Sequence, residues 1–239
     1  MSSCSAEMHA SERLRMPLVR DRLQWLTELA ARTDGEVAHL GCADSPYTDD
    51  LLAAGLLLHE RLLRVANVTG FDVDDQALDT LRRAHPDARL VNADITQGVP
   101  ADDRNRYALV IAGEVLEHVP DADAFLRATA ELLAPGGQLA VTVPNACCPK
   151  IGLRSLAGRE SVHPDHRVYY GPRTLTRTLA GAGFETDELA SCFAPIQGSA
   201  GRYVFNPLLG ASHRLFQGPV GDGLIATASA RPNASAIAS

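Results

Sequence analysis

The sequence has few aromatic residues, no excess of positive charge and no long hydrophobic run. Aromatic residues make up 5% of the 239 residues, and 22 Lys and Arg residues are outnumbered by 29 Asp and Glu residues, for a net charge of −7. A chain of this charge presents no broad positive field to a nucleic acid or an anionic lipid surface. The longest apolar run, residues 51–58, covers eight residues and is too short to cross a bilayer. We therefore expect no nucleic-acid partner and no membrane partner.

Cysteine is also scarce and irregularly spaced. The five cysteines form no CxxC pair, which argues against a disulfide framework or a zinc knuckle. The first residues contain no apolar core of the kind that forms a signal peptide. Because 46% of the residues are hydrophobic and 21% are charged, the composition is typical of a soluble globular chain. We expect a cytoplasmic protein with reduced thiols.

Short apolar strands alternate with amphipathic helices along most of the chain. The spacing predicts helices over 13–32, 49–66, 75–84, 122–133 and 174–182, and strands over 36–40, 67–73, 88–92, 107–112 and 138–143. Apolar strands joined by helical crossovers build a parallel sheet that is covered on both faces. The predicted fold class is therefore doubly wound α/β. Two further strands, 184–189 and 223–230, are expected as antiparallel additions at the sheet edge.

The ligand of an open parallel sheet binds beyond the carboxyl ends of the strands, where the strand order reverses. Asp72 ends the second predicted strand, and Asp94 follows the third. Asp72 can accept two hydrogen bonds from the hydroxyls of a ribose, which leaves capping of the next helix to Asp74 or Asp75. Asp94 is interpreted as an acceptor for an adenine amino group, with stabilisation of a turn as the alternative.

The turn after the first strand contains a single glycine, Gly41, in the sequence GCADSP. It departs from the GxGxxG pattern that brings backbone close to a pyrophosphate. This departure disfavours a nicotinamide-dependent or flavin-dependent enzyme. A cofactor without phosphates needs less anion binding at this turn, and an acidic site favours a cationic cofactor. S-adenosylmethionine is such a cofactor.

Five stretches, in order along the chain, resemble the class I S-adenosylmethionine-dependent methyltransferases. They are VAHLGCADS, VTGFDVD, VNADI, VIAGEVLEHVPD and LLAPGGQLAVTVPN. The resemblance implies a mostly parallel seven-stranded sheet with helices on both faces, whose last hairpin places an antiparallel strand between two parallel ones. It also implies S-adenosylmethionine as cofactor. The domain would span 36–230, after an N-terminal helical lid over 1–35 and before a flexible tail over 231–239.

The resemblance assigns cofactor contacts to particular positions. Gly41 and its turn would lie against the methionine part, Glu114 would stand near the methionine end, and the ribose and adenine would be held by Asp72, Val73, Ala93, Asp94 and Ile95. His39 stands where the family usually has an acidic residue, and Ala43 and Ser45 replace two glycines. These three positions are also expected to lie against the cofactor.

The acceptor is expected to be a small molecule, with a sugar or natural-product hydroxyl favoured and nitrogen second. Methyl transfer to a hydroxyl requires loss of a proton, and histidine is the side chain best suited to accept it near neutral pH. His118 follows the fourth strand, and His166 lies in an irregular segment, 146–172, that is expected to cap the acceptor. A structural role for His118 is the alternative.

Other interpretations of this region remain open. His163 and His166 in HPDH resemble a metal-ligand pair, but a solvated turn is favoured and no metal is expected. Glu117 is interpreted as a carboxylate at a helix start. For the chain as a whole, the alternatives are a non-catalytic methyltransferase-like subunit and, with less support, a nicotinamide-dependent oxidoreductase. A homodimer is an open alternative to a monomer.

Overall fold

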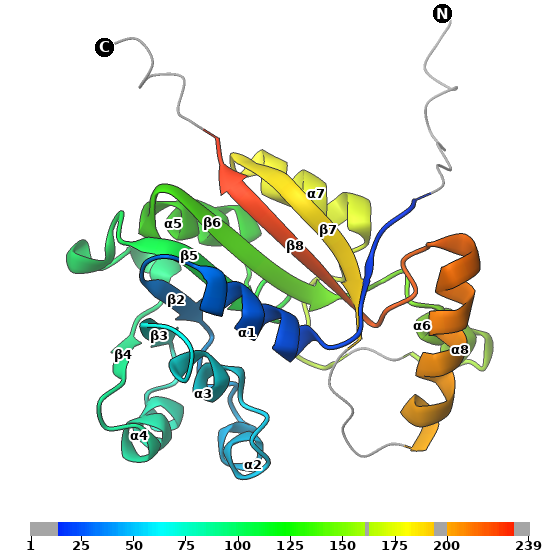
Figure 1. Ribbon diagram of the computed structural model, residues 1–239, viewed down its shortest axis with the longest axis horizontal. Helices are drawn as coiled ribbons and strands as arrows, with labels where there is room; N and C mark the ends of the chain where they lie inside the picture. The colour runs from blue at the N-terminus through cyan, green and yellow to red at the C-terminus, as the bar shows by residue number, and fades with distance from the viewer. Residues whose placement is uncertain (1–13, 161–162, 194–199, 232–239) are drawn as a thin grey trace, which may run out of the picture.

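A computed structural model describes residues 14–160, 163–193 and 200–231, and its centre is a single sheet (Figure 1). The eight strands lie in the order β1-β7-β8-β6-β5-β2-β3-β4, and β8 alone is antiparallel to its neighbours. Their bounds are β1 Leu18–Val19, β2 Val37–Leu40, β3 Val68–Asp72, β4 Arg89–Asn92, β5 Tyr107–Gly113, β6 Leu133–Pro144, β7 Phe184–Cys192 and β8 Gly223–Ala230. The predicted doubly wound α/β fold is thereby confirmed, with one edge strand beyond the expected seven. The expectation from the pattern that the last two strands are antiparallel additions at the edge was wrong: β7 is parallel to β1, which is the edge strand, and the antiparallel β8 lies between β6 and β7, as the resemblance implied.

Helices cover both faces of the sheet. Figure 1 shows α1 on one side and α5 and α7 on the other. The bounds are α1 Arg22–Arg32, α2 Thr48–Ala53, α3 Leu58–Leu63, α4 Asp75–Ala84, α5 Ala122–Leu132, α6 Pro149–Leu156, α7 Pro172–Gly181 and α8 Ala200–Phe216, with short 3₁₀ turns at η1 Ile95–Gln97 and η2 Ala101–Asp103. None of the helices in the described part of the chain is long and apolar enough to cross a membrane.

The two faces of β5 show why a nearly continuous apolar strand is required. Leu109 and Ile111 belong to the buried cluster formed with α1 and α3, whereas Val110 and Ala112 belong to the cluster formed with α5 and α7. Successive side chains of a strand point to opposite faces, so a strand covered on both sides has no solvent-facing position for polar residues. This burial fixes the carboxyl end of β5 in the middle of the sheet.

The N-terminal segment differs from its prediction. The helix expected over 13–32 begins only at Arg22, because Asp21 caps it by accepting a hydrogen bond from the Gln24 amide at 3.0 Å. Before the cap, Leu18 and Val19 form β1 and pair with Ser191 and Cys192 of β7. The apolar residues before Arg22 fit a short edge strand as well as a first helical turn, so the sequence pattern could not distinguish the two.

Two further expectations were wrong in detail. The single helix predicted over 49–66 is two helices, α2 and α3, with Gly55 between them at φ 64°, a left-handed conformation that glycine adopts without strain. The segment expected to be irregular, 146–172, contains α6. The four cysteines of the described residues are free, as expected, and three of them are buried.

Candidate functional site

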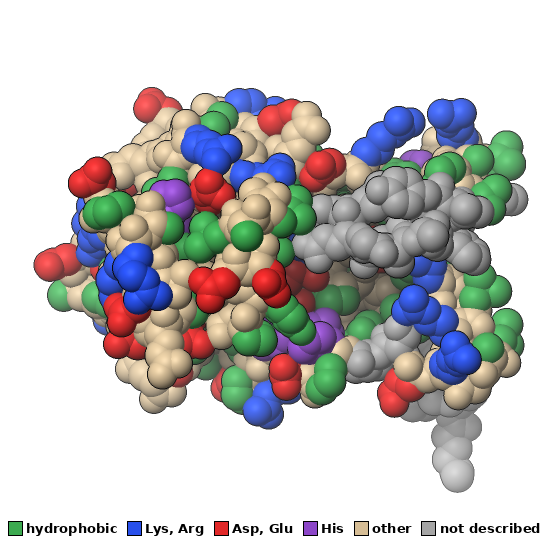
Figure 2. Space-filling view, turned by 90° about the horizontal axis from the view of Figure 1, so that it is seen from below, with side chains coloured by type: hydrophobic (Ala, Val, Ile, Leu, Met, Phe, Trp, Pro, Cys, Tyr) green, Lys and Arg blue, Asp and Glu red, His purple; other side chains and the backbone are tan. Residues whose placement is uncertain are grey.

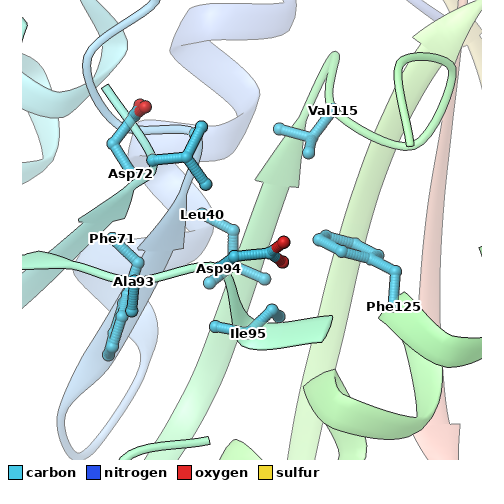
Figure 3. A pocket seen from close by; sticks show the side chains of 10 residues that line it. Leu40, Phe71, Asp72, Ala93, Asp94, Ile95, Val115 and Phe125 are labelled. Carbon is cyan, nitrogen blue, oxygen red and sulfur yellow. The ribbon is translucent and has the colours of Figure 1, made fainter. Parts of the chain in front are cut away.

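A recess opens at the carboxyl ends of the parallel strands, where the strand order reverses between β2 and β5. Figure 3 shows aromatic and aliphatic side chains around it with carboxylates at its rim. Its lining residues come from the ends of β2 and β3 and the residues that follow them, from the segments after β4 and β5, and from α5: Leu40, Gly41, Phe71, Asp72, Val73, Ala93, Asp94, Ile95, Val115 and Phe125. A slot with apolar walls and few polar groups is suited to a flat heterocycle joined to a polar sugar.

Asp72 ends β3 at the rim of this recess and organises the surrounding backbone. Its Oδ2 atom accepts a hydrogen bond from the Ala43 amide at 2.9 Å, and its Oδ1 atom accepts one from the Asp74 amide at 3.0 Å. Each carboxylate oxygen has a further lone pair with which to accept a hydroxyl hydrogen. Asp74 caps α4 by accepting from the amides of Gln76 and Ala77. Capping therefore falls to Asp74, as expected, and leaves Asp72 at the recess.

The turn after β2 separates the recess from a second one. Gly41 has φ 68°, and a Cβ atom on it would lie 2.5 Å from Cγ2 of Val115. Only glycine therefore fits between the turn and the segment after β5. Ser45 donates a hydrogen bond from Oγ to Oδ2 of Asp74 at 2.6 Å, and Ala43 is fully buried. Ser45 thus fastens the turn to the start of α4, and Ala43 contacts Asp72 through its backbone.

Residues 93–95 form the far wall of the first recess. Asp94 caps η1, because its Oδ1 atom accepts hydrogen bonds from the Thr96 amide at 2.9 Å and the Thr96 hydroxyl at 2.6 Å. Figure 3 shows the same carboxylate pointing into the recess toward Phe125. Asp94 therefore stabilises a turn and also faces the recess, so the two roles weighed for it are compatible. Val73, in contrast, is 66% exposed at the rim.

The second recess adjoins the first at Gly41. It is lined by polar residues that include Arg22, His39, Asp44 and Glu114. Arg22, in the first turn of α1, forms an ion pair with Glu114, which follows β5 at φ 56°. The Arg22 side chain is 16% exposed and that of Glu114 is 32% exposed, so this pair of opposite charges is largely shielded from water. The sequence analysis named Glu114 but not Arg22 for this region, because nothing in the sequence distinguishes an inward-pointing arginine in the first turn of an amphipathic helix.

His39 lies in β2 and is 3% exposed. Its ring stacks on that of His59 with centroids 5.4 Å apart, and the two Nδ1 atoms are 3.3 Å apart. Burial and the mutual proximity of the rings lower the pKa of His39 well below its usual value, while burial and His85 lower the pKa of His59 to about 4. The pair is therefore neutral, and one ring donates to the other.

Acidification is expected to destabilise the fold through this pair. Unfolded histidine titrates near about pH 6.5, so below that pH the unfolded chain binds protons that the folded chain excludes. The contribution of the neutral pair to the free energy of unfolding is full above about pH 6.5. It is lost as the pH falls toward the lowered pKa values of the two histidines in the folded state. For His59 the loss is on the order of 3 kcal/mol by the pH of its folded-state pKa, about 4. Urea unfolding at a series of pH values measures it.

A variant without the titrating ring provides the comparison. His59→Gln is expected to flatten this part of the pH dependence, whereas His213→Gln, which changes a histidine bonded to the Met16 carbonyl, is expected to leave it unchanged. An identical pH dependence in the His59→Gln variant would contradict the assignment.

A cluster of histidines lies where the cap segment meets the turn after β5, close enough for His166 to interact electrostatically with Glu114. The ring centroid of His118 is 4.7 Å from that of His166, and the ring of His163 is 5.0 Å from that of His166. The Arg167 amide donates to the Glu117 carbonyl at 2.8 Å and holds the two segments together. The structure thus brings together His118 and His166, which are 48 positions apart in the sequence.

Glu117 lies beneath this cluster and is fully buried. The interpretation of Glu117 as a helix-start carboxylate is wrong, because α5 begins at Ala122 and is capped by Asp121. Burial, reinforced by the Glu114 carboxylate, raises the pKa of Glu117 well above its usual value. Burial and the neighbouring rings of His118 and His163 lower the pKa of His166. Both effects favour the neutral forms of these groups near neutral pH.

Comparison with known proteins identifies the family. Residues 13–189 match the family described as a methyltransferase domain. The ubiquinone biosynthesis O-methyltransferase of Azorhizobium caulinodans is 31% identical over 205 residues, which cover 81% of this chain and 78% of the relative. The enzyme of the same name from Aeromonas salmonicida is 28% identical over 188 residues, covering 73% of this chain and 74% of the relative.

Solved structures share the fold. The N-methyltransferase NodS from Bradyrhizobium japonicum, in complex with S-adenosylhomocysteine, superposes with a TM-score of 0.54 at 18% identity and covers 89% of this chain and 86% of its own. A methyltransferase from Archaeoglobus fulgidus superposes with a TM-score of 0.53 at 16% identity and covers 87% and 90%. The resemblance noted in the sequence is confirmed, and the nicotinamide-dependent alternative falls away. The chain belongs to the methyltransferase domain family and is an S-adenosylmethionine-dependent methyltransferase.

Proposed function

We propose that this protein transfers the methyl group of S-adenosylmethionine to an oxygen atom of a small molecule. The observation that supports it most directly is the histidine cluster, in which His166 interacts electrostatically with Glu114, a residue that lines the recess proposed for the methionine end of the cofactor. Hydroxyl acceptors must lose a proton, and imidazole side chains near the acceptor can promote that loss. The relatives named as O-methyltransferases support the same choice of acceptor atom.

In this proposal the adenosine part of the cofactor occupies the first recess. Asp72 accepts hydrogen bonds from the two ribose hydroxyls through the lone pairs that its backbone contacts leave free. The adenine lies between the apolar walls, with Ala93 and Ile95 on one side and the Asp94 carboxylate facing its amino group. Val73 contacts the ribose from the rim.

The methionine part occupies the second recess, past Gly41. The paired charges of Arg22 and Glu114 are complementary to a zwitterion, so Arg22 faces the carboxylate and Glu114 faces the ammonium group. The turn residues Ala43 and Ser45 position the backbone around the sulfonium, and His39 closes the floor of the recess. The methyl group then points toward the histidine cluster.

The transfer itself is an in-line displacement. The acceptor oxygen attacks the methyl carbon from the side opposite sulfur, the carbon–sulfur bond breaks with its electron pair kept by sulfur, and S-adenosylhomocysteine leaves. The acceptor must approach to about 3 Å, so much of the rate comes from alignment. His118 and His166 are proposed to activate the acceptor oxygen for loss of its proton.

Removal of the Arg22 charge is expected to affect only ligands that carry the methionine carboxylate. In Arg22→Ala, affinity for S-adenosylhomocysteine should fall about 10–100-fold, because a charge-assisted contact contributes about 1.5–3 kcal/mol. Affinity for 5′-methylthioadenosine, which lacks the carboxylate, should stay within about twofold. Titration calorimetry with both ligands measures the difference. Arg20→Ala, at an exposed position near the start of α1, is the matched control, and equal losses for both ligands would contradict the assignment.

The function as a whole is tested by an acceptor screen. Purified protein is incubated with methyl-labelled S-adenosylmethionine and a panel of phenols, sugars, hydroxylated natural products and amines. Labelled methyl ether is the expected product. Transfer to amines alone would overturn the choice of oxygen, and cofactor binding without transfer to any member would favour a non-catalytic subunit.

A further inference from the structure

We propose that Glu117, His118 and His166 bind a divalent transition-metal ion that holds the acceptor oxygen during methyl transfer. The role of the ion rests on the proposed function, whereas the site rests on geometry alone. One ligand atom from each of the three side chains lies within 4.8 Å of those of the other two. Two imidazoles and one carboxylate form a donor set that suits Zn²⁺, Mn²⁺ or Fe²⁺ better than Mg²⁺, which prefers oxygen ligands.

The first argument for the ion is that buried polar atoms of Glu117 and His166 have no hydrogen-bond partner among the described residues. Glu117 is fully buried, and both of its carboxylate oxygens lie among the described residues without a hydrogen bond. The Nδ1 atom of His166 is likewise buried and unbonded, and its Nε2 atom is 4.0 Å from Oε1 of Glu117. Buried polar atoms without partners are costly and uncommon. A cation between these side chains satisfies the carboxylate and the imidazole together.

The second argument is that the backbone holds the ligands in place from both sides. Glu117 and His118 lie on a tight turn in which the His118 amide donates to the Val115 carbonyl at 2.9 Å. His166 lies on a second turn, closed by its amide and the His163 carbonyl at 3.1 Å, and the Arg167 amide ties this turn to Glu117. Ligand atoms that each lie about 2.1 Å from an ion are about 3.0–3.4 Å from one another. Small side-chain rotations that move each ligand atom by about 1 Å are enough to bring the three atoms to such distances.

The third argument is the orientation of His118. Its Nδ1 atom lies 3.3 Å from the Asp165 carbonyl and donates to it, which directs the lone pair to Nε2. Metal-bound histidines are commonly oriented in this way by a carbonyl or carboxylate on the other ring nitrogen. Figure 2 shows acidic and histidine side chains on one side of the hollow of this face and Lys or Arg side chains on the other. The Glu114 and Asp165 carboxylates act electrostatically on His166 and favour a cation at this position.

Three protein ligands leave coordination positions for the acceptor. Catalytic metal sites keep such an open position, and binding to the ion lowers the pKa of a hydroxyl group. The acceptor hydroxyl then releases its proton to solvent, and its oxygen attacks the methyl carbon. The acceptor class is therefore a molecule whose hydroxyl can reach and coordinate the ion. On this proposal, His118 and His166 activate the oxygen as ligands and do not accept its proton.

Metal binding is tested on the full-length, untagged protein after chelator treatment. Titration with Co²⁺, followed by its visible absorption, is expected to show one ion per chain. Affinity should fall at least about 10–100-fold in Glu117→Gln, His118→Ala and His166→Ala, and His85→Ala, a histidine at the end of α4, should bind as the parent does. Retained S-adenosylhomocysteine binding shows that each variant is folded. Substoichiometric binding, or equal affinity in all four variants, would overturn the site.

The role of the ion is tested separately from the function. With an acceptor from the screen, methyl transfer should fall at least about 100-fold after chelation and return on addition of Mn²⁺ or Zn²⁺. Full activity in the chelated protein overturns the catalytic role of the ion and leaves the proposed function intact. One Co²⁺ bound per chain without transfer to any acceptor overturns the proposed function and leaves the site intact.

Discussion

Asp72→Ala is expected to lower the affinity for S-adenosylhomocysteine by at least about 100-fold. Two hydrogen bonds from ribose hydroxyls to a carboxylate contribute about 1.5–3 kcal/mol each, and both are lost. The substitution also removes the acceptor for the amides of Ala43 and Asp74. The turn after β2 therefore loses the hydrogen bond that joins it to β3. Titration calorimetry measures the affinity, and the unfolding midpoint in urea measures the structural part of the effect.

Two further variants separate these effects. Asp72→Asn keeps the shape of the side chain and one acceptor oxygen, so it should retain the fold and still lose at least about tenfold in affinity. Asp87→Ala removes an exposed carboxylate beyond the end of α4 and should bind as the parent does. Unchanged binding in both Asp72 variants would show that the ribose lies elsewhere.

His166→Ala and His118→Ala are each expected to lower turnover by about 10²–10⁴-fold, the usual cost of losing a group that promotes loss of a proton from the acceptor, here as a ligand of the proposed ion. Neither side chain lines either of the two recesses proposed to hold the cofactor. Affinity for S-adenosylhomocysteine should therefore stay within about twofold of the parent value. The measurement is turnover at saturating cofactor with an acceptor from the screen.

The control for this pair is His213→Gln, in which a histidine bonded to the Met16 carbonyl is changed. Its turnover should match that of the parent. If both His118→Ala and His166→Ala remain fully active, oxygen activation does not depend on the cluster, and alignment alone accounts for the rate.

The sheet and the position of the first recess could be predicted from sequence because their determinants are local. An apolar strand such as Tyr107–Gly113 must be covered on both faces, and a polar residue at its end must lie at the carboxyl edge. Asp72 and Gly41 were found for this reason. The backbone contacts of Asp72 and the positive φ of Gly41 then show why these residue types stand there.

The acceptor side could be predicted only in part, because its contacts join distant segments. His118 and His166 were chosen individually for their chemistry, but their proximity depends on the bond between Arg167 and Glu117. Arg22 was missed since its role depends on where α1 crosses the sheet. The burial of Glu117 was missed too, because its position after β5 gave no indication that the cap segment would cover it.

The pairing of β1 with β7 has a consequence for how the protein matures on the ribosome. Arg22 follows a strand whose only described neighbour in the sheet, β7, ends at Cys192. The N-terminal strand is therefore synthesised early and stays unpaired until β7 has emerged. Arg22 gains this support only late in translation, so nascent chains that end before β7 would lack a fully assembled second recess.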